Sequence, residues 1–130
     1  MNALLAECLR RGTGELRLFE NNDEIVLRHC SNSLLLSVQL TPLRPDKSLL
    51  MTWLRVGEVS LDHFQGALAQ APASGALWLL HCLHDRHDEQ LLQRCLESLL
   101  NQRDTWRATV ARLHRAAPQR NPTSLRSLLY

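Results

Sequence analysis

The feature that most constrains this chain is a long helical repeat that begins at Asp88. Apolar residues recur there in steps of three and four over about seven helical turns. They are Leu91, Leu92, Cys95, Leu96, Leu99, Leu100, Trp106, Val110 and Leu113. Acidic residues stand at the start and basic residues at the end, as the helix dipole favours. The repeat predicts a long C-terminal helix that Pro118 ends.

A short helix and a hairpin are expected near the N-terminus. Apolar residues at helical spacing predict a first helix over residues 4–9, which the glycines in 12–14 stop. Apolar and polar residues then alternate over 16–18, and a second apolar run covers 25–27. The turn residues Asn21-Asn22-Asp23 separate these two runs, a pattern typical of a β-hairpin.

Two further strands are expected, one on each side of the middle of the chain. Residues 34–40 follow a turn at 31–33 and have one fully apolar side. The apolar run 76–83 lies between Gly75 and a polar cluster, as expected of a central strand.

The stretch 48–56 fits either a helix or a strand. Leu50, Trp53 and Leu54 suit a helix, whereas Thr52, Trp53 and Val56 suit a strand. We predict a strand, because nine residues match a strand's length and the preceding Pro-Asp-Lys is typical of a turn.

A second helix is predicted to follow. Ser60 is a suitable N-cap, and Leu61, Phe64, Leu68 and Ala71 then share one helical face. The sequence Pro-Ala-Ser-Gly at 72–75 ends the pattern.

Strands grouped before helices indicate an α+β fold, with a mainly antiparallel sheet of about four or five strands packed with three helices. At 130 residues, 45% of them hydrophobic, the chain is expected to be one domain with a substantial core. We place that domain at 1–117 and a flexible tail at 118–130. The apolar end of the tail is expected to fray, or to fold as a short helix in a partner's groove.

The chain is expected to remain in the cytoplasm. No apolar run approaches the roughly 20 residues that span a bilayer. The first residues place their apolar stretch before their arginines, the reverse of a signal peptide.

Basic residues are concentrated at the end of the chain. Residues 101–130 carry six arginines against Asp104, a sum of +5, whereas the first 100 residues sum to −3. This distribution favours an acidic partner, and nucleic acid is an alternative. However, Arg103 and Arg107 lie nearly opposite Arg112 on a helical wheel. Because the arginines do not form one stripe, nucleic-acid binding is the weaker hypothesis.

The sequence offers no catalytic or metal-binding motif. His81, Cys82, His84 and His87 are close together, with Cys95 beyond them, but their spacing matches no zinc site. A strand at 76–83 would also point His81 and Cys82 to opposite faces. We therefore predict no metal, no cofactor and no enzymatic activity. The four cysteines lack a CxxC pair and are interpreted as small buried apolar residues.

Apolar surface is the remaining clue to function. The chain has 29 leucines, more than a thin α+β domain easily buries, and such a surplus is typical of a protein interface. The candidate interface residues are Trp53, Leu61, Phe64, Leu68 and Trp78.

The element order and apolar spacing resemble those of the class I chaperones of type III secretion systems. The resemblance covers about residues 2–116. It is carried by Ala76-Leu77-Trp78-Leu79-Leu80, Asp88-Glu89-Gln90-Leu91-Leu92 and Leu99-Leu100-Asn101-Gln102-Arg103-Asp104-Thr105-Trp106. The resemblance implies the order helix, three strands, helix, strands and long helix.

It also implies a homodimer joined through the second helix, here the face of Leu61, Phe64 and Leu68, and a protein partner bound in extended form. Chaperones of effectors are usually acidic, whereas this chain has a sequence pI near 8.5. The chain therefore most resembles the HrpG-like, chaperone-like regulatory proteins of Hrp-type systems, which sequester a regulatory protein. A classical effector chaperone is the alternative within the same family.

Overall fold

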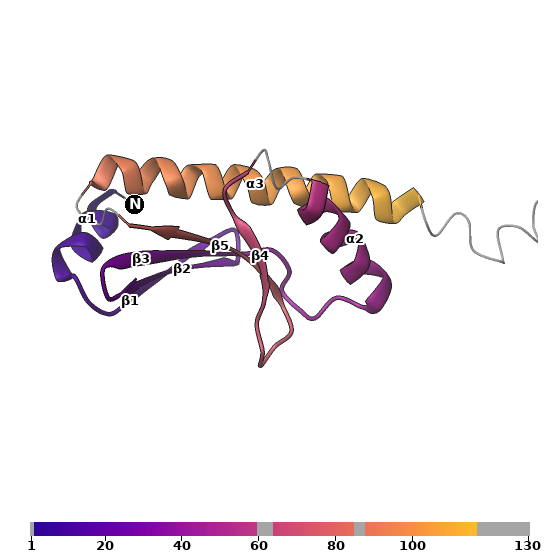
Figure 1. Ribbon diagram of the computed structural model, residues 1–130, viewed down its shortest axis with the longest axis horizontal. Helices are drawn as coiled ribbons and strands as arrows, with labels where there is room; N and C mark the ends of the chain where they lie inside the picture. Colours follow the sequence, from indigo (N-terminus) through magenta and orange to yellow (C-terminus); the bar gives the residue numbers. More distant parts are fainter. Residues whose placement is uncertain (1, 60–63, 85–87, 117–130) are drawn as a thin grey trace, which may run out of the picture.

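A computed structural model describes residues 2–59, 64–84 and 88–116, which form three helices and five strands (Figure 1). The elements in chain order are α1 (Asn2–Arg11), β1 (Glu15–Glu20), β2 (Asp23–Cys30), β3 (Ser33–Gln39), α2 (Lys47–Val59), β4 (Ala67–Gln70), β5 (Leu77–Leu83) and α3 (Glu89–Ala116). The predicted tail 118–130 lies outside the described residues. The predicted α+β fold with a long C-terminal helix is confirmed.

The five strands form one antiparallel sheet in the order β1-β2-β3-β5-β4. Side chains alternate across it, so that the pairs Leu27 and Leu36 or Val38 and Leu79 face one side. We call this buried side the inner face. The intervening residues lie on the outer face, and β1 and β4 are the edge strands.

The hairpin between β1 and β2 has the turn residues that its geometry requires. Asn21 and Asn22 have φ angles of 52° and 72°. Positive φ at both central residues is typical of the type I′ turn, which asparagine tolerates better than most residues do. The predicted hairpin is therefore confirmed.

The core lies between the inner face and α3. Leu92, Leu96 and Leu99 of α3 are buried in the same cluster as the inner-face leucines. Figure 1 shows α3 running along the sheet, with α1 near its first turns and α2 near its later half. One long helix thus contacts both other helices as well as the sheet.

The segment 48–56 is a helix, so the predicted strand is wrong. Asp46, which we interpreted as part of a turn, caps α2 by accepting a hydrogen bond from the Leu49 backbone at 2.8 Å. Trp53 and Val56 are buried on one face of this helix. The helical spacing of Leu50, Trp53 and Leu54 therefore indicated the correct element.

The predicted helix from Ser60 to Ala71 is also wrong where the structure describes it. Residues 60–63 lie outside the described residues, and 67–70 form the edge strand β4. The amide side chain of Gln102 on α3 accepts from the Gly66 backbone nitrogen and donates to the Gly66 oxygen, both at 2.9 Å. This buried amide satisfies the backbone of a segment that has no helical bonds of its own.

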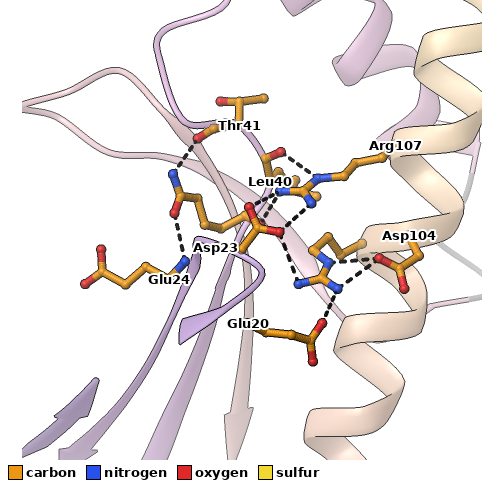
Figure 2. Close-up of polar contacts among 9 residues, drawn as sticks. Glu20, Asp23, Glu24, Leu40, Thr41, Asp104 and Arg107 are labelled. Atoms are coloured by element: carbon orange, nitrogen blue, oxygen red, sulfur yellow. Dashed lines mark hydrogen bonds and ion pairs between the residues drawn. The ribbon is translucent and has the colours of Figure 1, made fainter. Parts of the chain in front are cut away.

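Two arginines of α3 tie the helix to the β1–β2 turn (Figure 2). The first, Arg103, has only 5% of its side chain exposed and lies 2.6 Å from Glu20 and 3.0 Å from Asp104. A buried guanidinium group thus has two carboxylates within hydrogen-bond distance.

The second arginine, Arg107, binds both a carboxylate and the backbone. It makes a bidentate pair with Asp23 at 2.7 and 2.9 Å. It also donates to the backbone oxygens of Leu40 and Gln39, at 3.0 and 3.1 Å. We give the name arginine clamp to the group formed by Glu20, Asp23, Arg103, Asp104 and Arg107.

The clamp lowers the pKa of Asp23. The main cause is the hydrogen bond from Arg107, and the positive charges of Arg107 and Arg103 act in the same direction against the effect of burial. An aspartate in an unfolded chain titrates near pH 3.9. The contribution of Asp23 to stability is therefore complete above that pH. It is lost as the pH falls through the lower pKa that Asp23 has in the folded protein.

We expect Asp23→Asn to reduce the free energy of unfolding at pH 7 by about 2 kcal/mol, because charged hydrogen bonds to Arg107 are lost. Urea unfolding at pH 7 and at about pH 3 measures this effect. The difference between wild type and variant should shrink at the lower pH. Glu97→Gln, which changes an exposed carboxylate on α3 outside the arginine clamp, is the control. If Asp23→Asn lowers the free energy of unfolding by the same amount at both pH values, the charge of Asp23 is not the cause of the loss.

Candidate protein-binding surface

The outer face of the sheet holds a groove of about 370 Å³, which we call the sheet groove. Its large apolar side chains on β2, β3 and β5 are Val26, Leu35, Trp78 and Leu80. One wall is formed by residues 69–72 and Ser74, around the turn between β4 and β5. The helices pack on the inner face, which leaves this apolar strip accessible to a partner.

The groove arises because large and small residues face each other on neighbouring strands. Trp78 of β5 lies opposite Ala69 of β4, and Leu80 lies between Ala67 and Ser37. Small side chains beside large ones leave a hollow that the sheet itself does not fill. A hollow with an aromatic wall is typical of the pockets that hold hot-spot residues of a protein partner.

The opposite rim of the groove carries charges of both signs. Arg17 contacts Glu15 and Glu24 at 2.7 and 2.8 Å, and Arg28 contacts Glu15 at 3.3 Å. The hydrogen bond from Arg17 is the largest cause of the lowered pKa of Glu15. Exposed pairs of this kind contribute little to stability. Because the two arginines and two glutamates cancel in charge, the apolar side chains dominate the character of this groove.

The structure separates the five residues that the sequence predicted for the interface. Trp78 lines the sheet groove. Trp53 is buried, with only 4% of its surface exposed. Phe64 and Leu68 pack against the chain's own core, and the centre of the Phe64 ring lies 6.5 Å from that of Trp106, edge-on. Leu61 lies outside the described residues.

A different apolar surface is exposed on α2. Met51, Leu54 and Val59 are 47%, 46% and 78% exposed, whereas Trp53 and Val56 of the same helix are buried. Sequence reasoning missed this surface because it assigned most of the segment to a strand. The helical spacing of Leu50, Trp53 and Leu54 was the signal that would have found it.

Two of the six arginines near the C-terminus are neutralised within the fold. Arg103 and Arg107, two of the six arginines behind the predicted acidic partner, are held by Glu20, Asp23 and Asp104. They are therefore unavailable to a phosphate backbone. This arrangement weakens the case for a nucleic-acid interface at α3.

The cysteines correct one prediction. Cys8 is buried and Cys95 is half-buried, but Cys30 and Cys82 are exposed, so these two are not small core residues. Burial raises the pKa of Cys8 and Cys95. Across the ranges 2–59, 64–84 and 88–116, no group of three or more histidine, cysteine or acidic residues could hold a metal ion. Likewise, no described helix is long and apolar enough to cross a membrane.

The fold has counterparts among proteins of type III secretion. Neither a protein-family model nor a curated protein sequence matches the chain. Among solved structures, the chain is similar to a chain of the heterodimeric ExoU–SpcU complex from the type III secretion system of Pseudomonas aeruginosa. That match has a TM-score of 0.58 and 23% identity, over 84% of this chain and 96% of that chain.

Two further complexes contain a similar chain. For the ExsC–ExsE complex the TM-score is 0.60 with 17% identity, over 82% of this chain and 90% of that chain. For the HopA1–SchA chaperone–effector complex the TM-score is 0.59 with 19% identity, over 82% of this chain and 91% of that chain. At these identities the likeness establishes a shared fold.

Fluorescence quenching can test whether the sheet groove is open in the isolated protein. Of the three tryptophans, Trp53 and Trp106 are buried and Trp78 is partly exposed. We expect Trp78→Phe to remove most of the emission that acrylamide quenches, and Trp53→Phe to leave it. If Trp78→Phe leaves the quenchable fraction unchanged, another part of the chain covers the groove.

Proposed function

We propose that this chain is a type III secretion chaperone-like protein that binds and sequesters a regulatory or secreted partner protein. In this way it would influence secretion or the expression of secretion genes, as the HrpG-like regulatory proteins do. The function requires no catalytic residue and no cofactor, and it would take place in the cytoplasm. The observation that carries the proposal is the uncovered apolar groove on the outer face, around Trp78 and Leu80.

Two further observations support a protein partner. The three solved structures reported above are complexes, one of them a chaperone with its effector. Within the described sheet, the edge strand β1 pairs on one side only, and its Phe19 has 70% of its surface exposed. An extended partner segment can add to such an edge by main-chain hydrogen bonds.

We also propose a homodimer that forms through α2. The exposed residues Met51, Leu54 and Val59 take the place of the face of Leu61, Phe64 and Leu68 that the sequence suggested. Exposed apolar residues gathered on one helix are typical of an interface between copies. Phe64 and Leu68 instead contribute to the core of the single subunit.

Co-expression with proteins encoded beside a secretion gene cluster tests the partner-binding function. We expect one of them to form a stoichiometric, soluble complex, measured by light scattering after size exclusion. Trp78→Ala should weaken that complex roughly tenfold or more, because a partly exposed aromatic in a groove is a typical hot spot. Arg94→Ala on an exposed part of α3 is the control. If no such protein forms a complex, the proposed function fails.

Sedimentation of interface variants tests the dimer. Met51→Glu combined with Leu54→Glu should give a folded monomer, because both side chains are exposed in the single subunit. Phe64→Glu with Leu68→Glu should instead lower the melting temperature, because charges would enter the subunit core. An unchanged mass for the α2 variant would place the dimer contact elsewhere.

A further inference from the structure

We infer that a second groove, between α2, the end of α3 and the loop 40–45, binds a partner segment whose apolar residues are flanked by acidic ones. We call it the α2–α3 groove. Its volume is about 350 Å³, close to that of the sheet groove, but it lies on the helical side of the molecule. The inference rests on the proposed function, to which it adds a place and a chemical class of partner.

The groove has an apolar floor and an exposed apolar rim. Leu40, Trp53 and Val110 form the floor and are nearly inaccessible to solvent. Leu43 on the rim is 74% exposed, so its side chain is available to a partner. A pocket of this form accommodates one or two aliphatic side chains of a bound segment.

Two buried polar atoms of the lining have no hydrogen-bond partner within the described part of the chain. They are Nε1 of Trp53 and Nδ1 of His114. An indole nitrogen can only donate, whereas a histidine ring nitrogen donates or accepts according to which nitrogen carries the proton. Buried polar atoms without partners are rare in folded proteins.

The ionisable residues that line the α2–α3 groove are Arg44, Arg107 and His114, none of which carries a negative charge. Arg107 is neutralised by Asp23. Arg44 is exposed, and no acidic side chain in the described ranges forms an ion pair with it. It lies against Gly75, where φ is +76° and a Cβ would collide with the guanidinium group. The fold therefore presents at the groove a cation that no described acidic residue neutralises.

The acid closest in sequence does not cancel that charge. Asp46 follows Arg44 by two positions and caps α2, so its negative charge offsets the positive potential of the helix N-terminus. The first turn of α2 contains no acidic residue, and its first residue is Lys47. Arg44 and Lys47 therefore exceed Asp46 by one positive charge in this region. The sheet groove, with its balanced rim, has no such bias.

Charge also distinguishes the partner from other occupants. Residues 117–130 follow α3 and end in apolar residues, but they contain Arg120 and Arg126 and no acidic residue. A basic segment beside Arg44 would be repelled, whereas an acidic-apolar segment is attracted. A second copy of the chain would meet the same cations on both sides of a symmetric contact.

Peptide binding to the full-length protein tests the inference. The probes are fluorescein-labelled short peptides in which leucine alternates with glutamate, with glutamine or with lysine. We expect the glutamate peptide to bind roughly tenfold more tightly than the glutamine peptide at low salt, and the lysine peptide most weakly.

Substitutions at the rim locate this preference in the groove. Arg44→Glu and Leu43→Glu should each remove it, and Arg44→Lys should keep it. Arg94→Glu, the same charge change far from the groove, is the matched control. Circular dichroism checks the folding of the variants, which we expect to be retained because Leu43, Arg44 and Arg94 are all exposed.

Three kinds of result in these experiments would overturn the inference. The first is equal affinity for all three peptides, or an equal loss in Arg44→Glu and Arg94→Glu, since either would indicate non-specific binding. The second is tighter glutamate-peptide binding when Leu128 and Leu129 are both replaced by serine, since residues 117–130 would then be the occupant. The third is a change in sedimenting mass on Leu43→Glu, which would make the groove an interface between copies.

The peptide result and the co-expression result are separate readouts. A stoichiometric complex that forms equally well with wild type and Arg44→Glu would remove the α2–α3 groove from the binding site and leave the proposed function standing. The absence of any complex in co-expression would remove the proposed function itself.

Discussion

The arginine clamp is the interaction on which the arrangement of the fold depends. Arg103 is almost fully buried, and a buried guanidinium without counter-charges would be strongly destabilising. Glu20 and Asp23, from the ends of β1 and β2, supply those charges. Arg107 also binds the backbone oxygens of Gln39 and Leu40 at the end of β3. One stretch of α3 thereby fixes the position of three strands.

The two grooves follow from this arrangement and differ in charge. The sheet groove has a rim on which Glu15 and Arg17 neutralise each other, so it offers apolar contact. The α2–α3 groove is lined by Leu40, whose backbone oxygen accepts a hydrogen bond from Arg107. It is also lined by Arg44, whose positive charge no described acidic residue neutralises. A long partner could use both, with an apolar segment on the sheet and an acidic-apolar segment beside α2.

Sequence reasoning correctly predicted elements whose structure is encoded by patterns of residues close together in the sequence. The periodicity of α3 and the asparagine turn were sufficient by themselves, because each encodes its geometry in adjacent residues. The segment around β4 depends on distant partners instead. Gln102 binds Gly66, and Trp106 packs on Phe64, contacts that no local pattern reveals.

The candidate site divides in the same way. Trp78 lines the sheet groove because strand alternation, a local property, turns it away from the core. Phe64 has its place in the subunit core because Trp106, far along the chain, packs on it. The counter-charges of Arg103 and Arg107 come from the β1–β2 turn, so composition alone could not show that these two arginines are internal to the fold.

The clamp also has a consequence for how the chain is made. Glu20 and Arg103 are separated by 83 positions, so a growing chain completes all five strands before the helix that covers them exists. Until α3 emerges, the inner-face leucines have no long helix to pack against. Nascent chains that stop before α3 would therefore expose the apolar side of a finished sheet, a form prone to aggregate.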